Sequence, residues 1–295
     1  MTSPKAKMLL GDLGILLVAL IWGSTNVIIR DALAGITPLW FCTLRFAVAC
    51  ATVWLLFRRQ ALTMTRRGRI TGSLIGTAFV CAYLLGAVGL LYTTAGNQSF
   101  LISMSVVFVP LAVWAGSRRF PGWHVIAAVA LCTAGMAGLM LGEGMSVNLG
   151  DVLSFAAMLF VTAYILLVQK FVKDADPYGL VVWQATGGML LAFACSAILE
   201  PFPAHIGTAA WLAIVHCGTV GFALTLVLQN VAQKYTSATH AAILLSTSSV
   251  FGSVLGVIFL GEPMTPKIFV SSALILMGVL VAELAPALKR GASGK

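Results

Sequence analysis

Ten apolar runs follow one another along the chain, and each has the length of a membrane-spanning helix. A helix needs about 17–25 predominantly apolar residues to cross the hydrocarbon core of a bilayer. Short, turn-like connections join the runs, as at residues 35–38 and 261–266. We therefore predict an all-α integral membrane protein with ten transmembrane helices and no second, soluble domain. The predicted spans cover residues 9–30, 38–57, 70–91, 97–116, 123–142, 149–171, 178–199, 208–230, 239–260 and 267–287.

The composition supports the membrane class. Apolar residues make up 60% of the 295 residues and charged residues 9%, whereas soluble domains contain about 45–50% and 25%. The formal net charge of +9 would fit a nucleic-acid-binding protein, but such proteins gather basic residues on a polar surface that this chain lacks. The six cysteines lie singly within apolar runs, so we interpret them as packing residues rather than as a disulfide or metal site.

The first run is predicted to remain in the protein as its first helix. Lys5 and Lys7 precede it, and residues 32–34 resemble a signal-peptidase site. However, the run is longer than the apolar core of a signal peptide, about 7–15 residues, and it carries Asn26 and Arg30 before that site. An uncleaved helix fits these features better.

The positions of lysine and arginine predict the orientation in the membrane. If the N-terminus is cytoplasmic, fifteen of these residues lie in inside segments, two lie outside, and Arg45 lies within a span. Cytoplasmic loops carry an excess of basic residues. Both termini are therefore expected to face the cytoplasm, in a multi-pass protein of a bacterial inner membrane.

One stretch of sequence occurs twice. The segments 92–108 and 235–251 share eight identities in seventeen aligned positions, at an offset of 143 residues. Weaker echoes pair Gly11 with Gly150 and Pro38 with Pro177. The offset is close to half of the chain, so a duplicated unit is predicted.

The repeat and the number of spans together predict an inverted arrangement. Each half contributes five spans, and because five is odd the second half enters the membrane upside down. Such inverted-topology repeats are typical of secondary transporters, whose substrate site lies near the membrane midplane between the halves. We predict one repeat in residues 1–144, a second in residues 149–287, a central cavity between them, and a cytoplasmic tail in residues 288–295.

Several motifs resemble the drug/metabolite transporter superfamily, in its EamA-type ten-helix branch. They are ALIWGSTNVIIR in the first span, Pro38 with Arg45 in the second, the YTxA starts at 92 and 235, and LGEPMT at 260–265. The resemblance implies a basket of ten helices in which spans 1, 3, 4, 6, 8 and 9 line the cavity. The first half departs from the family pattern, since residues 117–120 read SRRF where a Gly-Glu like 261–262 is usual.

Within this superfamily, the aromatic content of the predicted core resembles the aromatic amino acid exporters called YddG. That resemblance implies export of phenylalanine, tyrosine and tryptophan, and of cationic aromatic compounds.

Polar and aromatic residues at mid-span predict the substrate site. Aromatic faces with a few hydrogen-bond donors suit an amphipathic aromatic solute better than a sugar or an ion. Any one of these side chains could instead face lipid or pack in the core, but as a set they converge from spans 1, 3, 6 and 8. The predicted substrate-binding residues are Trp22, Asn26, Tyr83, Tyr164, His216, Thr219 and Phe222.

Four further residues are candidates for the cavity or a gate. Arg45 lies about 10 Å below the outer end of its helix, where an arginine needs a partner or water; it either holds a substrate carboxylate or ties its helix to a neighbour. Ser103 and Ser246 occur in the repeated stretch and either line the cavity or allow close helix packing. Pro110 is predicted to kink its helix and is a candidate hinge.

The charged residues and the motifs also bear on the energy source of transport and on the alternative functions. Every Asp and Glu falls at a span end or in a loop, so we expect facilitated transport, or weak coupling through His216, rather than strong proton coupling. The sequence contains no G-x-x-x-x-G-K-[ST], HExxH or GxSxG, which argues against ATP hydrolysis and against an enzyme. A passive channel and an intramembrane hydrolase remain the alternatives from other classes.

We therefore predict a secondary transporter that exports small amphipathic metabolites, aromatic amino acids first, by alternating access. The alternative substrates are other amino acids or cationic drugs, exported in exchange for protons. The expected partners are a small-molecule substrate and the lipid bilayer, without nucleic acid, metal or cofactor. A monomer is the working assumption, and the oligomeric state stays open.

Overall fold

The computed structural model describes residues 4–32, 36–89, 91–93, 98, 101–118, 120–140, 148–260 and 265–292, and the side chains of 4–6, 26–32, 139–140, 256, 260 and 283–292 lie outside this description. Every regular element in these ranges is helical. Seven helices are long and apolar enough to cross a membrane, and three shorter apolar helices accompany them at 101–117, 123–138 and 266–282. Together they correspond to the ten predicted spans, which confirms the predicted fold class.

The first half of the chain forms spans 1 to 5. Span 4 begins with a short helical stretch, residues 101–103, that a turn at Met104 separates from its main helix. The helices are α1 (Pro4–Ala32), α2 (Pro38–Thr63), α3 (Arg66–Gly89), α5 (Ser105–Ser117) and α6 (Trp123–Met140).

The second half forms spans 6 to 10, and two of these spans depart from a regular α-helix. Span 8 is continuous but passes through a π-helical segment, η2, and span 9 breaks at Ser246 and Thr247. The elements are α7 (Leu149–Phe171), α8 (Pro177–Leu199), α9 (Thr208–His216), η2 (Cys217–Leu224), α10 (Thr225–Gln233), α11 (Ala238–Leu245), α12 (Ser248–Leu260) and α13 (Pro266–Ala292).

Local sequence fixes several helix starts. Pro38 and Pro177 occupy the first turn of α2 and α8, where the missing backbone N–H is not needed and the fixed φ suits a helix. The Asp176 carboxylate accepts a hydrogen bond from the Gly179 N–H at 2.8 Å. Asn148 and Asp151 form a reciprocal capping box at the start of α7. The equivalent prolines at the starts of α2 and α8 therefore allow the two repeats to be aligned at these helices.

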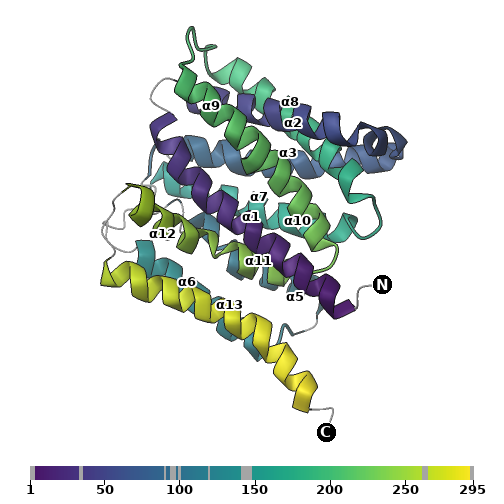
Figure 1. Ribbon diagram of the computed structural model, residues 1–295, viewed down its shortest axis with the longest axis vertical. Helices are drawn as coiled ribbons and strands as arrows, with labels where there is room; N and C mark the ends of the chain where they lie inside the picture. The colour runs from purple at the N-terminus through teal and green to yellow at the C-terminus, as the bar shows by residue number, and fades with distance from the viewer. Residues whose placement is uncertain are drawn as a thin grey trace.

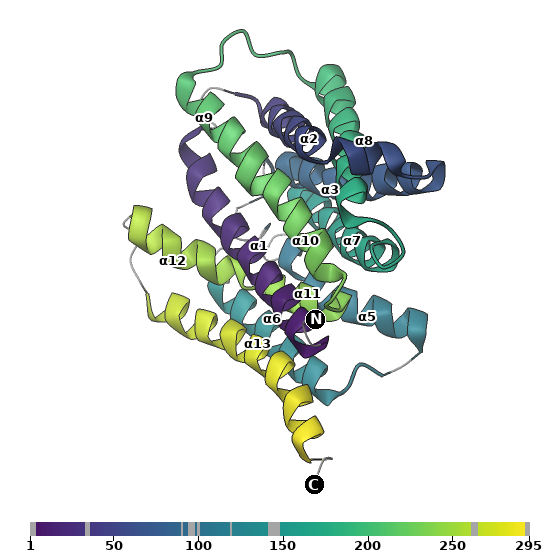
Figure 2. The same ribbon diagram turned by 45° about the vertical axis from the view of Figure 1, so that its right-hand side comes forward.

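The two halves interlock rather than stand side by side. Helix α2 packs on α8 at one edge of the molecule, and α6 packs on α13 at the other (Figures 1 and 2). Between these edges, α3 packs on α7 and α8, just as span 8 packs on α1 and α2. Likewise α1 packs on α12 as α7 packs on α5. These main contacts between the halves therefore recur with the halves exchanged, as expected for a pseudo-two-fold axis.

The contact between α6 and α13 shows this symmetry at single residues. A Cβ at Gly135 would lie 2.5 Å from the Ser271 carbonyl oxygen, and one at Gly278 would lie 2.8 Å from the Ala128 carbonyl oxygen. Only glycine allows the backbones to approach this closely. The equivalent positions differ by 143 throughout, which is the offset of the repeated stretch: Ala128 and Ser271, Cys132 and Ile275, Gly135 and Gly278.

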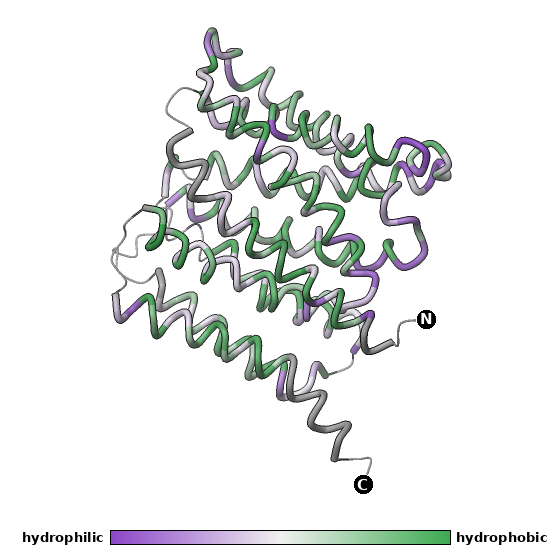
Figure 3. Tube along the Cα trace, in the orientation of Figure 1, coloured by the Kyte–Doolittle hydropathy of each residue, from purple (hydrophilic) through white to green (hydrophobic). Residues whose placement is uncertain are grey.

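The polar residues gather at one end of the bundle. The start of α1, the α2–α3 turn, the α7–α8 turn and the α10–α11 turn all lie on the right in Figure 1, where Figure 3 shows most of the hydrophilic trace. This end, which we call the basic end, contains the exposed side chains of Arg58, Arg59, Arg66, Arg67, Lys170, Lys173 and Lys234. The opposite end holds the start of α2 and the end of α3.

Related contacts close the two ends of the bundle. At the opposite end, a Cβ at Gly150 would lie 2.6 Å from the Thr93 backbone nitrogen, and the Thr93 hydroxyl donates a hydrogen bond to Asp151. At the basic end, the equivalent Gly11 lies against the end of α10 and the turn that follows it, with its Cβ position 3.0 Å from the Ala232 carbonyl oxygen and 3.3 Å from the Tyr235 Cβ. Of these two equivalent contacts, the one at the opposite end is therefore the closer.

Candidate functional site

Six aromatic side chains from five elements meet in the middle of the bundle. Phe79 on α3 lies at their centre: its ring centroid is 4.5 Å from that of Tyr164, 4.9 Å from Tyr83 and 5.8 Å from Phe222. Offset and edge-to-face contacts at such distances are favourable for aromatic pairs. We call this group the aromatic cluster; its members are Trp22 on α1, Phe46 on α2, Phe79 and Tyr83 on α3, Tyr164 on α7 and Phe222 on η2.

The cluster contains four predicted site residues and two that sequence reasoning missed. Trp22, Tyr83, Tyr164 and Phe222 were each predicted from a mid-span position. Phe79 has a usable signal, because it lies four residues before Tyr83 and so shares its helix face. Phe46 carries no such signal, since many phenylalanines of the chain lie within apolar runs.

The π-helical segment η2 brings span 8 into this cluster. A π-helix replaces the usual i→i−4 backbone pattern and is frequent at functional sites. The Trp22 indole N–H donates to the Gly221 carbonyl at 3.2 Å and to the Thr225 hydroxyl at 3.3 Å. Phe222, 2% exposed, lies on the same segment. Span 1 is thus tied to span 8 at the point where span 8 departs from regular α-helix.

Arg45 adds a buried positive charge to the cluster. It is 6% exposed, and its guanidinium carbon lies 4.7 Å from the ring centroid of Phe222 and 5.1 Å from that of Tyr83. One terminal nitrogen lies 3.2 Å from the Cys42 sulfur, and the described part of the chain gives the Nε atom no hydrogen-bond partner. Cation–π contacts offset part of the cost of burying this charge. They leave directional hydrogen-bonding capacity at Nε.

A second polar group lies towards the basic end of the cluster. Four amide side chains there are between 0% and 2% exposed, and none was predicted as a site residue. Gln184 on α8 and Asn230 on α10 exchange two hydrogen bonds, at 2.9 and 3.0 Å. Gln229 accepts from the Tyr164 hydroxyl at 3.4 Å, and Gln233 donates to the Ile165 carbonyl at 3.3 Å. We call these four side chains the amide group.

The sequence gives only an ambiguous signal for the amide group. Buried polar residues within membrane spans are rare and usually face the bundle interior. Gln229, Asn230 and Gln233 fall in one turn of span 8, close to its end, where they resemble an ordinary polar helix terminus. Only the packing of α10 against α7 and α8 shows that they are enclosed.

The remaining predicted site residues lie outside the cluster or outside the described side chains. The Asn26 side chain belongs to the latter. Thr219 donates its hydroxyl to the Val215 carbonyl of its own helix at 2.8 Å. His216 is half-buried on α9. Within the described residues, neither His216 nor Thr219 joins the ring contacts.

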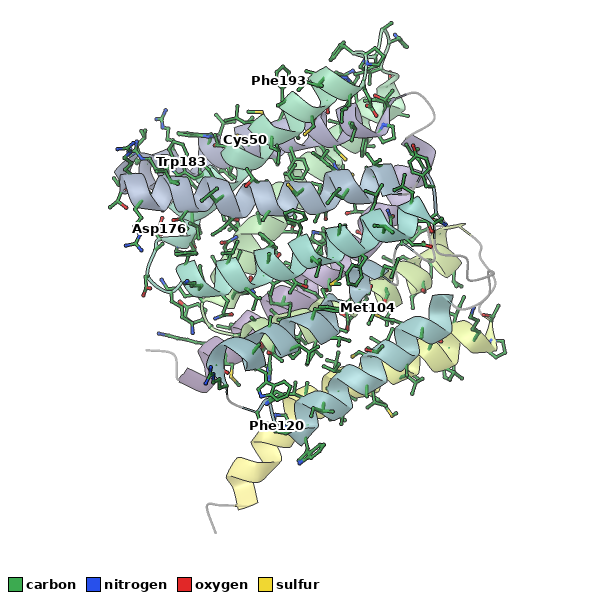
Figure 4. All side chains as sticks on the ribbon, turned by 180° about the vertical axis from the view of Figure 1, so that it is seen from behind. Cys50, Met104, Phe120, Asp176, Trp183 and Phe193 are labelled. Atoms are coloured by element: carbon green, nitrogen blue, oxygen red, sulfur yellow. The ribbon has the colours of Figure 1, made fainter. Side chains whose placement is uncertain are left out.

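Ser103, Pro110 and Ser246 lie near the breaks in spans 4 and 9. Span 4 breaks at Met104, labelled in Figure 4, and span 9 at the equivalent position Thr247. The Ser246 hydroxyl donates to the Ile243 carbonyl at 2.6 Å, a local bond that bends helices. Pro110 is buried within α5, six residues beyond the Met104 break.

Comparisons with known proteins agree on one class. The model of the EamA-like transporter family matches residues 9–141 and again residues 148–284. An uncharacterized transporter of Archaeoglobus fulgidus is 31% identical over 278 residues, which cover 94% of this chain and 87% of the relative. The uncharacterized transporter YwfM of Bacillus subtilis is 23% identical, with 93% of this chain and 94% of the relative covered.

A solved crystal structure supports the fold. It superposes with a TM-score of 0.81 over 96% of this chain and 98% of that chain, at 17% sequence identity. Identity this low shows the fold alone. The two matches to one family model fall on the two halves that the helix contacts relate by symmetry.

Proposed function

Since the chain belongs to the EamA-like transporter family, we propose that it exports small amphipathic metabolites, aromatic amino acids first, by alternating access across a bacterial inner membrane. In this proposal both termini and the basic end face the cytoplasm, as the distribution of lysine and arginine favours. The halves 1–144 and 149–287 act as the two repeats, and residues 288–295 form a tail. The likeness to the YddG exporters belongs to the same proposal.

The observation that carries the substrate class is Arg45 among the aromatic rings. Its unpartnered Nε can donate a charge-assisted hydrogen bond to a carboxylate, the strong class of hydrogen bond. The rings of Phe222 and Tyr83 beside it offer an apolar, aromatic contact surface. A carboxylate attached to an aromatic group satisfies both. A buried guanidinium repels cations, so this site disfavours the cationic drugs that the sequence left as an alternative.

The proposed cycle uses the pseudo-two-fold symmetry. Substrate enters at the basic end while the contacts of Gly11 are open, binds at the aromatic cluster, and leaves at the opposite end after the contacts of Gly11 close and those of Gly150 open. Because the acidic residues fall at span ends or in loops, the cycle runs down the substrate gradient without a coupling ion.

Exchange in proteoliposomes tests this proposal. Vesicles with purified protein and labelled internal phenylalanine are diluted into buffer containing tryptophan, leucine, lysine or no solute. We expect external tryptophan to accelerate efflux of label, with saturation, while lysine has no effect and a pH gradient does not change the rate. Protein-free vesicles give the leak.

Two outcomes contradict parts of the proposal separately. Efflux that neither saturates nor responds to an external aromatic amino acid indicates a channel. Accumulation driven by a pH gradient shows proton coupling and makes His216 the first residue to substitute.

A further inference from the structure

The amide group stands at one end of the aromatic cluster and Arg45 at the other. Tyr164 joins them, since its ring packs on Phe79 at 4.5 Å and its hydroxyl reaches Gln229 at 3.4 Å. Phe79 in turn contacts Tyr83, over whose ring the Arg45 guanidinium lies. One continuous set of side chains therefore leads from a neutral polar group near the basic end to a cationic group near the opposite end.

Two members of the amide group each have a side-chain atom that could form a further hydrogen bond. Gln229 and Gln233 are both 0% exposed and lie one turn apart on α10. In the described part of the chain, Gln229 Nε2 and Gln233 Oε1 have no hydrogen-bond partner. A buried polar atom without a partner costs about 1–3 kcal/mol, so this arrangement is unfavourable unless something else meets it.

The chemistry of these two atoms defines the ligand groups that would bind to them. Gln229 Nε2 is a donor and requires an acceptor, whereas Gln233 Oε1 is an acceptor and requires a donor. A solute that presents both within one helical turn, about 5.4 Å, matches the pair. The ammonium and carboxylate of an α-amino acid are such a combination, and a neutral amide pair accepts this head group, which has no net charge, without adding an unpaired charge to the membrane interior.

The neighbouring amides have a different role. Gln184 and Asn230 satisfy each other, and Asn230 also donates to the Leu226 carbonyl at 2.8 Å. This pair fixes α10 against α8. It holds Gln229 and Gln233 towards α7, where their partners Tyr164 and Ile165 lie.

We propose that Gln229 and Gln233 bind the zwitterionic head group of an α-amino acid, with Gln229 donating to its carboxylate and Gln233 accepting from its ammonium group. The inference rests on the proposed function, since the side chain of such a solute would lie against Tyr164 and Phe79. The amide site is the station that substrate reaches first from the basic end, and Arg45 receives the carboxylate at the second. Nothing in this arrangement requires both stations to be filled at once.

Ligand binding by purified Arg45→Met protein, with each amide replaced in turn, tests the assignment, because the second station then has no guanidinium to hold a carboxylate. The ligands are phenylalanine, 2-phenylethylamine, which lacks the carboxylate, and 3-phenylpropionate, which lacks the ammonium group. Gln233→Met should weaken phenylalanine and 2-phenylethylamine about tenfold or more while leaving 3-phenylpropionate unchanged. Gln229→Met should weaken phenylalanine and 3-phenylpropionate and leave 2-phenylethylamine unchanged. The control is Gln60→Met, near the basic end of α2 and outside the amide group.

The crossed pattern separates recognition from structure. The unaffected ligand shows that each variant is folded. Equal weakening of all three ligands would mean that the amides only support the fold, and unchanged binding of all three would mean that they bind water. Either result overturns the assignment.

The same assay separates this inference from the proposed function. If wild-type protein binds leucine but not phenylalanine, the aromatic specificity fails, and the head-group site is tested with leucine, isopentylamine and 4-methylpentanoate instead. If no α-amino acid binds, the head-group site fails too.

Discussion

Arg45 and Gln184 occupy equivalent positions in the two repeats. Each lies seven residues after the proline that begins its helix, Pro38 or Pro177. The first is charged and surrounded by rings, and the second is neutral and paired with Asn230. The repeat thus places polar groups symmetrically, while the residue types give the two ends of the aromatic cluster different electrostatic character.

At the residue scale, Arg45→Met should reduce exchange of phenylalanine about tenfold to a hundredfold. The reason is the loss of a charge-assisted hydrogen bond, which contributes about 1.5–3 kcal/mol. Flux of 2-phenylethylamine, a cation without a carboxylate, should rise, because the variant removes the guanidinium that repels it. Initial rates of labelled exchange in proteoliposomes measure both. Arg58→Met, an exposed arginine further along α2, is the matched control, and equal loss of both fluxes would show that Arg45 acts on the fold.

The rings themselves give a second prediction at this scale. Trp22→Ala and Tyr83→Ala should each lower phenylalanine exchange about tenfold without lowering the amount of protein in the membrane, because each removes contacts worth about 0.5–1.5 kcal/mol per aromatic pair together with buried area. Tyr83→Phe should keep most of the flux, since the ring remains. Trp211→Ala, on the exposed face of α9, controls for loss of a tryptophan. Unchanged flux in both alanine variants would remove the proposed site.

At the scale of elements, the breaks in spans 4 and 9 fall within the stretch of sequence that occurs twice, 92–108 and 235–251. The breaks fall at Met104 and Thr247, 143 residues apart. Pro110 has no proline counterpart in span 9, where the equivalent residue is Ser253. Since both spans break at the same place, the proline is not needed for the break. The Ser246 and Thr247 hydroxyls, each bonded to a carbonyl three residues earlier at 2.6 Å, are the local cause in span 9.

The close approach of the α6 and α13 backbones yields a stability prediction. Gly135→Ala and Gly278→Ala should each destabilise the protein by about 1–3 kcal/mol, because the added methyl meets backbone atoms of the facing helix. The two effects should be similar in size, since the contacts are symmetric. Thermal unfolding of detergent-purified protein measures them. Gly116→Ala, where the added atom meets nothing within 4 Å, should change stability little; loss of stability there but not at Gly135 would contradict the assigned contacts.

At the scale of the whole molecule, the two ends of the bundle use related contacts at different separations. Gly150 is pressed against Thr93 at the opposite end, while Gly11 lies less closely against the end of α10 and the turn after it at the basic end. Alternating access requires each of these contacts to open in turn. The looser of the two contacts, that of Gly11, lies at the end through which the proposed substrate enters.

A disulfide across the basic end tests this requirement. A Cβ at Gly11 would lie 3.3 Å from the Tyr235 Cβ, near the 3.5–4.5 Å of disulfides. In a background without the six native cysteines, Gly11→Cys with Tyr235→Cys should stop phenylalanine exchange on oxidation and recover it on reduction. Free-thiol labelling measures bond formation, and the two single-cysteine variants are the controls. Full exchange with the bond formed would show that these segments need not separate.

Most of the fold was predictable because it depends on patterns that can be read along the sequence without knowing which helices touch. Span length, the 143-residue offset and the odd number of spans per half define a symmetric ten-helix protein. The positions of Trp22, Tyr83, Tyr164 and Phe222 in mid-span were enough to mark them as candidates. Their convergence on Phe79 was not predictable, because it depends on which helix faces meet.

The sequence by itself determined the class, the repeat and the number of spans, because hydrophobic length and duplication are properties of the chain in order. Only the tertiary structure decided that Arg45 lies among aromatic rings, that span 8 passes through a π-helix, and that Gln229 and Gln233 are fully enclosed. The physical reason is that burial of a polar side chain is set by the neighbouring helices. Those neighbours lie far away along the chain, as Phe222 does from Arg45 and Tyr164 from Gln229, and no local pattern in the sequence describes them.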